Sequence, residues 1–217
     1  KQTYYANGLL KTRTDQRGSV HTYVYDDIGR RTKDRLTTGG TGVDTDWVNS
    51  VVFGYDSHGR REKVTSWSGD DGDGTCRNEI QYEYDGYGDL AKSYQDQDGA
   101  VSAQYTPKVQ YAYDDTGLGK GRVLTAITYP TGRVVYHNYS VTAAGSWGRL
   151  ANIASSASPT DSQKFAEYSR LGGGTVAAVT YPAATVSGNP LRLSYGTGGT
   201  YSGWDRFGRV TAQKWEI

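Results

Sequence analysis

Polar and apolar residues alternate in short runs along this chain, and each run ends in a turn signal. In "TYVYDDIGRRT" (22–32), Tyr23 and Tyr25 fall on one face of an extended segment, and the residue between them faces the other way. Asp26 can cap a turn with its carboxylate, and Gly29 can adopt a positive φ there. The pattern predicts a strand, a tight turn and a return strand.

The same hairpin signal recurs at a nearly fixed interval. Four copies align as "YVYDDIGRRT" (23–32), "FGYDSHGRRE" (53–62), "YEYDGYGDLA" (82–91) and "YAYDDTGLGK" (111–120). Their turn glycines lie 30, 29 and 29 residues apart, at Gly29, Gly59, Gly88 and Gly117. A period of this length is typical of an array in which one supersecondary unit packs on the next.

Later copies of the hairpin are less regular. The segments "SWGRLANI" (146–153) and "FAEYSRLGGGTV" (165–176) keep parts of the pattern, and "YSGWDRFGRVT" (201–211) restores it with Trp204 in place of Tyr. We therefore expect a single repeat array of about seven units over residues 1–217. Longer loops are expected at 37–46, 68–75 and 154–163.

Composition favours a folded, all-β chain. Hydrophobic residues make up 35% of the sequence and the mean hydropathy is -0.70, but 19 Tyr and 5 Trp supply large rings that can be half buried. The 29 Gly residues supply turns, and helical periodicity is nearly absent. We predict repetitive antiparallel β-hairpins stacked into a curved or spiralling sheet.

Charge and cysteine content exclude several classes of protein. The 24 basic and 23 acidic residues are interspersed, which argues against a nucleic-acid partner. Cys76 is the single cysteine and cannot form an internal disulfide. No apolar stretch approaches the roughly 20 residues of a membrane span. The sequence starts at Lys1 and contains no Met, which predicts a fragment of a larger protein.

The recurring polar residues are expected to stabilise the fold rather than to catalyse a reaction. A carboxylate present in every unit is explained by turn capping more simply than by a glycosidase pair, and this holds for Asp26, Asp56, Asp85, Asp114 and Asp205. Guanidinium groups can pair with an Asp and stack on a Tyr of the same or the next unit, which is expected for Arg30, Arg60, Arg149 and Arg209. The Tyr rings are expected to pack between repeats, with a sugar-binding platform as the alternative.

No constellation of residues predicts a catalytic, cofactor or metal site. The loop "DDGDG" (70–74) lacks the spacing of a calcium-binding loop, because the required Glu position holds Tyr82, and "DQDG" (96–99) is interpreted as a turn with Gly99 at positive φ. The glycine runs "LGGGT" and "GTGGT" are interpreted as turns, since no phosphate-binding Lys follows them. Nothing in the sequence assembles the remaining candidate ligands and nucleophiles, His21, His58, His137 and Cys76.

The Tyr-x-Tyr-Asp-x-x-Gly-Arg repeat resembles the RHS/YD-repeat family, which includes bacterial RHS proteins, insecticidal toxin-complex proteins and the animal teneurins. The resemblance extends over nearly the whole chain, from "YYANGLLK" to "GWDRFGRV". It implies a β-sheet ribbon that spirals into a hollow shell, either enclosing a toxic C-terminal polypeptide or forming a rigid cell-surface barrel for adhesion. It also implies a secreted or cell-surface location. No Asp-Pro-x-Gly-type shell-closing segment is found, so an arc of a shell is expected.

Three functional hypotheses follow. The first is a structural β-shell or scaffold segment without enzyme activity, whose partners are flanking repeats, further copies of itself or an enclosed C-terminal polypeptide. The second is a surface module whose exposed Tyr and Trp bind a glycan or a protein. The third, an enzyme, has no residue constellation in its support.

Overall fold

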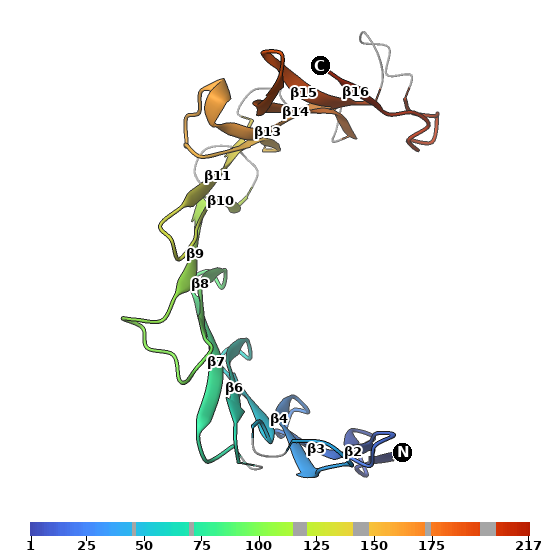
Figure 1. The fold of residues 1–217 in the computed structure, drawn as a ribbon, viewed down its shortest axis with the longest axis vertical. Coiled ribbons are helices and arrows are strands. Elements are labelled where there is room, and N and C mark those ends of the chain that lie inside the picture. The colour runs from blue at the N-terminus through green and yellow to red at the C-terminus, as the bar shows by residue number, and fades with distance from the viewer. Residues whose placement is uncertain (45–46, 70–71, 115–120, 141–147, 172–174, 196–202) are drawn as a thin grey trace. The chain divides into compact units, whose positions relative to one another are not determined.

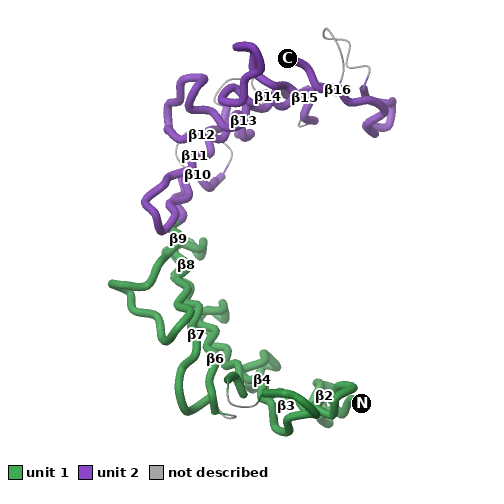
Figure 2. The backbone as a smooth tube through the Cα atoms, in the orientation of Figure 1, with its two compact units in different colours: residues 1–110 green, residues 111–217 purple. Residues whose placement is uncertain are grey.

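The computed structural model describes residues 1–217 except 45–46, 70–71, 115–120, 141–147, 172–174 and 196–202. The chain forms two compact units, Lys1–Gln110 and Tyr111–Ile217 (Figure 2). The interpretation of residues 1–217 as one repeat array stays a prediction. None of the described residues forms a helix long and apolar enough to cross a membrane.

The first unit consists of antiparallel strands that follow one another along the chain (Figure 1). The strands are β1 (Gln2–Tyr4), β2 (Leu10–Thr14), β3 (Val20–Tyr25), β4 (Arg31–Thr38), β5 (Ser50–Tyr55), β6 (Arg61–Trp67), β7 (Cys76–Tyr84) and β8 (Leu90–Asp96), followed by β9 (Lys108–Asp114). Each strand pairs with the strand before it and the strand after it, so β1 lies at an edge of the sheet.

The second unit continues the same succession of hairpins. Its strands are β10 (Val123–Thr128), β11 (Val134–Tyr139), β12 (Leu150–Ala154), β13 (Lys164–Leu171), β14 (Thr175–Val186), β15 (Asn189–Ser194) and β16 (Lys214–Glu216). A short 3-10 helix, η2 (Asp161–Gln163), precedes β13. The sixteen strands form one open sheet in sequence order, which confirms the predicted all-β class built of antiparallel hairpins.

Seven turns among the described residues share one hydrogen-bond pattern. In the turn 26–30, the Asp26 N–H donates to the Arg30 carbonyl (2.9 Å), and the Gly29 N–H donates to the Asp26 carbonyl (3.0 Å). Gly29 has φ +83°, the left-handed conformation that closes a three-residue hairpin loop. The same pattern occurs in the turns 5–9, 15–19, 26–30, 56–60, 85–89, 129–133 and 205–209.

The two ends of the strands in the first unit carry different connections. The short turns 5–9, 26–30, 56–60 and 85–89 lie at one end, because every second connection of a meander falls on the same side. Longer loops follow β4, β6 and β8 at the opposite end (Figure 1). The short-turn end therefore presents a regular series of near-identical turns.

Buried serines attach two of the longer loops to the sheet. Ser50 is 1% exposed, and its hydroxyl donates to the Gly69 carbonyl (2.6 Å) and accepts from the Gly72 N–H (3.1 Å). The Ser19 hydroxyl similarly accepts from the Gly40 N–H (3.3 Å). A side chain on Gly40 would collide with the backbone of the neighbouring turn, so the close approach requires glycine.

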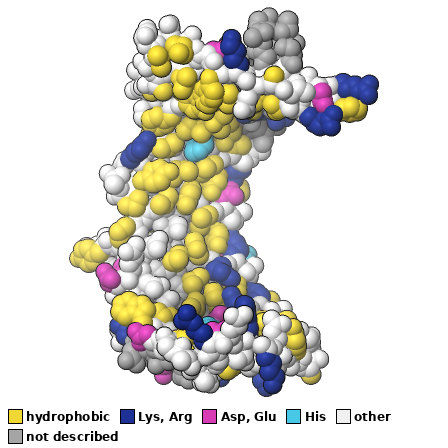
Figure 3. Space-filling model, turned by 45° about the vertical axis from the view of Figure 1, so that its right-hand side comes forward, with side chains coloured by type: hydrophobic (Ala, Val, Ile, Leu, Met, Phe, Trp, Pro, Cys, Tyr) yellow, Lys and Arg dark blue, Asp and Glu magenta, His cyan; other side chains and the backbone are white. Residues whose placement is uncertain are grey.

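The apolar core is thin and divided along the sheet. Tyr23, Phe53 and Tyr94 are the buried apolar side chains among the described residues of the first unit, whereas the buried apolar residues described in the second unit are all alanines. Most other strand residues are half buried. Hydrophobic side chains, including Tyr, cover much of the face drawn in Figure 3, with Lys and Arg between them. Partly exposed aromatic rings therefore cover this face of the sheet in place of a second layer of secondary structure.

Replacing a turn glycine tests the required backbone conformation. Gly59 has φ +82°, and a Cβ there would lie 3.0 Å from the Arg30 Nη1 atom. We expect Gly59→Ala to lower the free energy of unfolding by about 1–2 kcal/mol in urea titrations, because an L side chain is strained at this φ. Gly86→Ala is the matched control, since Gly86 has no positive φ and open space around its Cβ position. Equal losses for both variants would contradict this account.

Candidate functional site

The Asp carboxylate organises each regular turn. In the turn 26–30, Asp26 Oδ1 accepts hydrogen bonds from the backbone N–H groups of Ile28 (3.2 Å) and Arg30 (2.8 Å). The same two bonds form at Asp56, Asp85 and Asp205, which confirms the predicted turn capping at these positions. Asp114 ends β9, and the turn predicted to follow it lies outside the described residues.

The second carboxylate oxygen holds the arginine that follows the turn glycine. Arg30 Nε lies 2.7 Å from Asp26 Oδ2, and Arg60 Nε lies 2.7 Å from Asp56 Oδ2. The Arg209–Asp205 pair repeats this geometry at 2.6 Å. Backbone and side chain of one arginine are therefore fixed by one carboxylate.

The fixed arginine reaches the next repeat. The Arg30 guanidinium lies 4.4 Å from the centre of the Tyr55 ring, and Arg60 lies 4.3 Å from the centre of the Tyr84 ring. A Cβ built on Gly59 would lie 3.0 Å from Arg30 Nη1, and one built on Gly88 would lie 3.1 Å from Arg60 Nη1, so each guanidinium lies close over the turn glycine of the next repeat. This confirms the expectation for Arg30 and Arg60, whereas the stacking predicted for Arg149 stays a prediction.

The tyrosine hydroxyl completes the contact between repeats. Tyr55 Oη donates to the Arg31 carbonyl (2.9 Å), and Tyr84 Oη donates to the Arg61 carbonyl (2.8 Å). Tyr25 Oη donates to the equivalent Leu10 carbonyl (3.0 Å). Together these linked groups form a turn ladder: Asp26, Arg30, Tyr55, Asp56, Arg60 and Tyr84.

A second arginine in two repeats was not identified from the sequence. Arg31 and Arg61 lie 4.7 and 4.8 Å from the centre of the buried Phe53 ring. The recurring "GRR" at 29–31 and 59–61 is the sequence signal for these second arginines. Phe53 thus lies between two cations on neighbouring strands.

The environment of the turn carboxylates lowers their pKa. Desolvation acts to raise the pKa of Asp26 and Asp56, but hydrogen bonds and charge from Arg30 and Arg60 outweigh it, so both pKa values lie below the ordinary range. The Arg209 backbone N–H is the main cause of the lowered pKa of Asp205. These carboxylates are ionised at neutral pH, and their oxygens are already hydrogen bonded.

The copy at 82–91 departs from the ladder, because Asp89 replaces the arginine. A cluster around the buried Tyr94 ring lies on the strands of this hairpin instead, and its charged members are half exposed. Tyr94 Oη donates to Glu83 Oε1 (2.8 Å), and Lys92 Nζ lies 2.7 Å from Glu83 Oε2. Burial raises the pKa of Tyr94, and the hydrogen bond from Lys92 lowers the pKa of Glu83. Lys108, on the next strand, lies 5.4 Å from the centre of the Tyr94 ring.

The histidines and the cysteine occupy unrelated positions. His21 pairs with Asp34 (2.8 Å) across β3 and β4, and His58 lies at an exposed turn tip. His137 lies on β11, where burial lowers its pKa, and burial also raises the pKa of the Cys76 thiol. Within the described ranges, no three His, Cys, Asp or Glu side chains are grouped so that they could hold a metal ion.

The acidic loops were predicted to be turns. In "DQDG", the Asp98 N–H donates to Asp96 Oδ1 (3.1 Å), which confirms the turn, but Gly99 does not have the predicted positive φ. The connection after β8 is long, so it does not need the tight left-handed reversal of a three-residue loop. In "DDGDG", residues 70–71 lie outside the described residues, as do the runs at 172–174 and 196–202.

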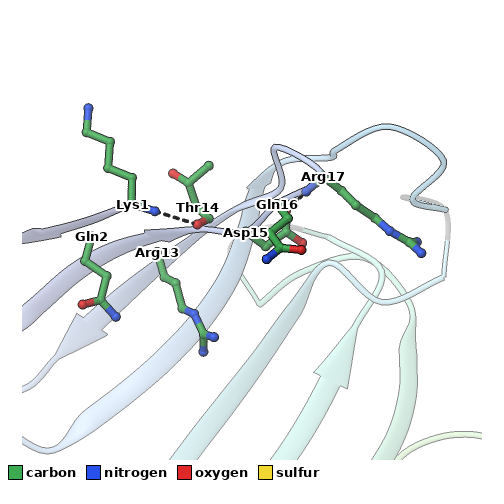
Figure 4. Close-up of a pocket in the computed structure, with 7 residues that line it drawn as sticks. All are labelled: Lys1, Gln2, Arg13, Thr14, Asp15, Gln16 and Arg17. Atoms are coloured by element: carbon green, nitrogen blue, oxygen red, sulfur yellow. Dashed lines mark hydrogen bonds between the residues drawn. The ribbon is translucent and has the colours of Figure 1, made fainter.

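Two hollows in the first unit are lined by polar residues, and the wall of the smaller one also contains apolar residues. The larger, about 720 Å³, lies along β1 and β2 and is lined by Lys1, Gln2, Arg13, Thr14, Asp15, Gln16 and Arg17 (Figure 4). There the Lys1 amino group donates to the Thr14 carbonyl (3.0 Å), and Asp15 caps its own turn. The smaller, about 330 Å³, lies beside the His21–Asp34 pair. The exposed side chains that line the larger hollow form no enclosed site.

No protein-family model matches the chain, and no curated protein matches it. Among solved structures, it is similar to a chain of the crystal structure titled TcdB2-TccC3-Cdc42, with 15% identity and a TM-score of 0.26 over 89% of this chain. It is also similar to a chain of TcdB2-TccC3 without its hypervariable C-terminal region, with 16% identity and a TM-score of 0.26. The matches cover 13% and 12% of those chains. Likeness at this level does not identify a family.

Removing one ladder hydroxyl tests the contact between repeats. We expect Tyr84→Phe to lower the free energy of unfolding by about 1 kcal/mol, because the Arg61 carbonyl loses its donor while the ring remains. Tyr105→Phe is the control, since the Tyr105 side chain is 79% exposed. Urea denaturation followed by circular dichroism measures both. A loss confined to the Tyr105 variant, or no loss in either, would contradict the role of the hydroxyl.

The turn carboxylates predict the pH dependence of stability. Because their pKa values are lower in the folded than in the unfolded chain, they stabilise the fold above the unfolded pKa. We expect the free energy of unfolding to fall as the pH drops below about 4, towards the folded pKa values. Asp56→Asn removes one such group, so its stability is expected to fall less steeply with acid, while the exposed-loop control Asp98→Asn follows the wild type. A steeper fall for Asp56→Asn would refute the assignment.

Proposed function

We propose that this chain is a non-enzymatic structural segment, a β-scaffold in which each hairpin is fastened to the next. The turn ladder is the observation that carries this proposal. The most regular polar residues of the sequence are occupied in contacts within a turn and between neighbouring turns. Contacts that recur from one hairpin to the next join the hairpins into a stiff sheet.

The chemistry of the turn carboxylates argues against catalysis by them. A general acid near neutral pH needs a raised pKa, and a general base or nucleophile needs an oxygen free to reach the substrate. At Asp26 and Asp56 the pKa is lowered, and both oxygens accept hydrogen bonds from the same turn. These groups are suited to holding a guanidinium.

The finer form of the proposal is a segment of a secreted or cell-surface shell. It rests on the resemblance of the repeated motif to the RHS/YD family. In that form, the partners are flanking repeats of the same polypeptide, further copies of the chain or an enclosed C-terminal polypeptide. Nucleic acid is not among the proposed partners, because the basic and acidic residues balance.

Exposed aromatic side chains favour a second candidate, a carbohydrate- or protein-binding surface. Trp47 is 61% exposed and Tyr105 is 79% exposed, and both belong to the longer loops of the first unit. Tyr87 is 76% exposed but lies in a short turn at the opposite end of the strands. These three described rings of the first unit therefore do not form one continuous platform, which makes this candidate the weaker of the two.

A double-mutant cycle on the ladder tests the scaffold proposal. We expect Arg60→Gln and Tyr84→Leu each to destabilise the chain, and the cycle to give a coupling energy of about 1 kcal/mol, because the guanidinium stacks on the ring. Arg77→Gln combined with Tyr84→Leu is the control, since Arg77 stacks on Trp47 instead. Additive losses in the ladder cycle would contradict the proposal. Saturable quenching of tryptophan fluorescence by a polysaccharide would instead support the binding surface.

A further inference from the structure

Two arginines of the first unit keep the N–H donors of their side chains free. Arg31 begins β4 and Arg61 begins β6, the two strands beside β5, which carries Phe53. The two guanidinium groups lie 4.7 and 4.8 Å from the centre of the Phe53 ring. In the described part of the chain, neither side chain donates a hydrogen bond to the protein. A guanidinium has five N–H donors around its edge, and stacking on a ring leaves that edge available.

The positive charge of this pair is compensated only in part. Asp34 Oδ2 lies 3.8 Å from Arg31 Nη1, beyond hydrogen-bond distance, and the other oxygen of Asp34 lies 2.8 Å from His21 Nδ1. Arg61 forms no ion pair with any carboxylate of the described residues, its exposed sequence neighbour Glu62 included. By contrast, the ladder arginine that precedes each of them is paired within its own turn.

Both cations are held in place from below and behind. Because they contact one ring, they can be no further apart than the sum of their distances to its centre, and like charges at such a separation repel each other. Their backbones are fixed as well, since the Arg31 carbonyl accepts the Tyr55 hydroxyl and the Arg61 carbonyl accepts the Tyr84 hydroxyl. An anion that binds here would relieve the repulsion and would find its partners already positioned.

We propose that Arg31 and Arg61 form a binding site for a doubly charged tetrahedral oxyanion, the chemistry of a sulfate or phosphate group. The oxygens of such an ion point in several directions and can accept hydrogen bonds from guanidinium groups on two different strands, whereas a planar carboxylate matches the edge of one. The Arg31 side chain is 41% exposed and Arg61 is exposed, so the site is open to solvent.

The size of the site limits the ligand to a single anionic group. Two cations suit one oxyanion, whereas binding of an extended polyanion depends on many phosphate contacts. The open position admits a free ion or an anionic group carried by a larger molecule. This binding function goes beyond the proposed scaffold function and does not depend on it.

Titration of the full, isotope-labelled chain with sodium sulfate tests the site, with sodium chloride keeping the ionic strength constant. The Nε–H signals of Arg31 and Arg61 in nuclear magnetic resonance spectra are expected to shift along saturable curves, with one common dissociation constant of about 1–10 mM. Arg133 is the internal reference, because it is an exposed arginine over a single ring, that of Phe165 (5.2 Å). Its signal is expected to shift little and without saturation.

Substitutions separate the pair from arginines in general. Arg61→Gln is expected to weaken sulfate binding, followed at the Arg31 signal, at least about tenfold, because it removes a charged donor. Arg61→Lys keeps the charge but loses the planar edge, so an intermediate affinity is expected. Arg133→Gln is the matched control and is expected to bind sulfate as the wild type does. Circular dichroism confirms that each variant retains β-structure.

A sulfated glucose distinguishes the two sources of the anion. Tighter binding than that of inorganic sulfate assigns the anion to a group on a larger ligand, and equal binding assigns the free ion; both outcomes support the site. Glucose without the sulfate is expected to shift neither arginine signal.

Unsaturable shifts of the Arg31 and Arg61 signals would overturn this inference, as would shifts equal to that of Arg133 or an unchanged affinity in Arg61→Gln. The scaffold function is judged separately, by the Arg60–Tyr84 coupling. A chain that shows this coupling but no saturable sulfate binding therefore refutes only the anion site.

Discussion

The bond between a turn aspartate and the arginine four residues later is the interaction on which the regular part of this structure depends. A free arginine side chain has many rotamers, and ordering it costs free energy. Asp26 orders the Arg30 side chain within their own turn, because its two oxygens accept hydrogen bonds from the backbone N–H and from the Nε of Arg30. The guanidinium is then already oriented when the Tyr55 ring packs on it. A local contact thereby prepares a contact between repeats.

Such preparation is important in a sheet with a thin core. With few fully buried side chains, the first unit cannot obtain its stability from one large apolar cluster. Contacts between neighbouring hairpins take its place, each worth about 0.2–1 kcal/mol. Stability then grows with the number of linked hairpins, as in other repeat proteins, and no single contact dominates.

Sequence reasoning succeeded where local chemistry decides the outcome. A period-2 pattern followed by Asp and Gly specifies a strand and a turn, and the capping at Asp26 and Asp56 follows from groups four residues apart. It failed where the deciding partner is distant in sequence. The Arg31 carbonyl that accepts the Tyr55 hydroxyl is 24 residues away, and only the strand register brings the two together. Gly99 was wrongly assigned a left-handed conformation because the pattern does not give the length of the loop.

The copy that lacks the ladder arginine keeps a contact between its strand and the next strand, at a different position. Where Asp89 replaces the arginine, Tyr94 and Lys108 lie opposite each other on β8 and β9, and the ammonium stacks on the ring. The Tyr94 hydroxyl is held by Glu83, as Arg30 is held by Asp26, so a carboxylate again orients the group that contacts the next strand. The contact has moved from the turn into the strand, and its chemistry of carboxylate, cation and ring is unchanged. A repeat can therefore lose its signature residue and remain joined to the next, which explains how irregular copies persist within one continuous sheet.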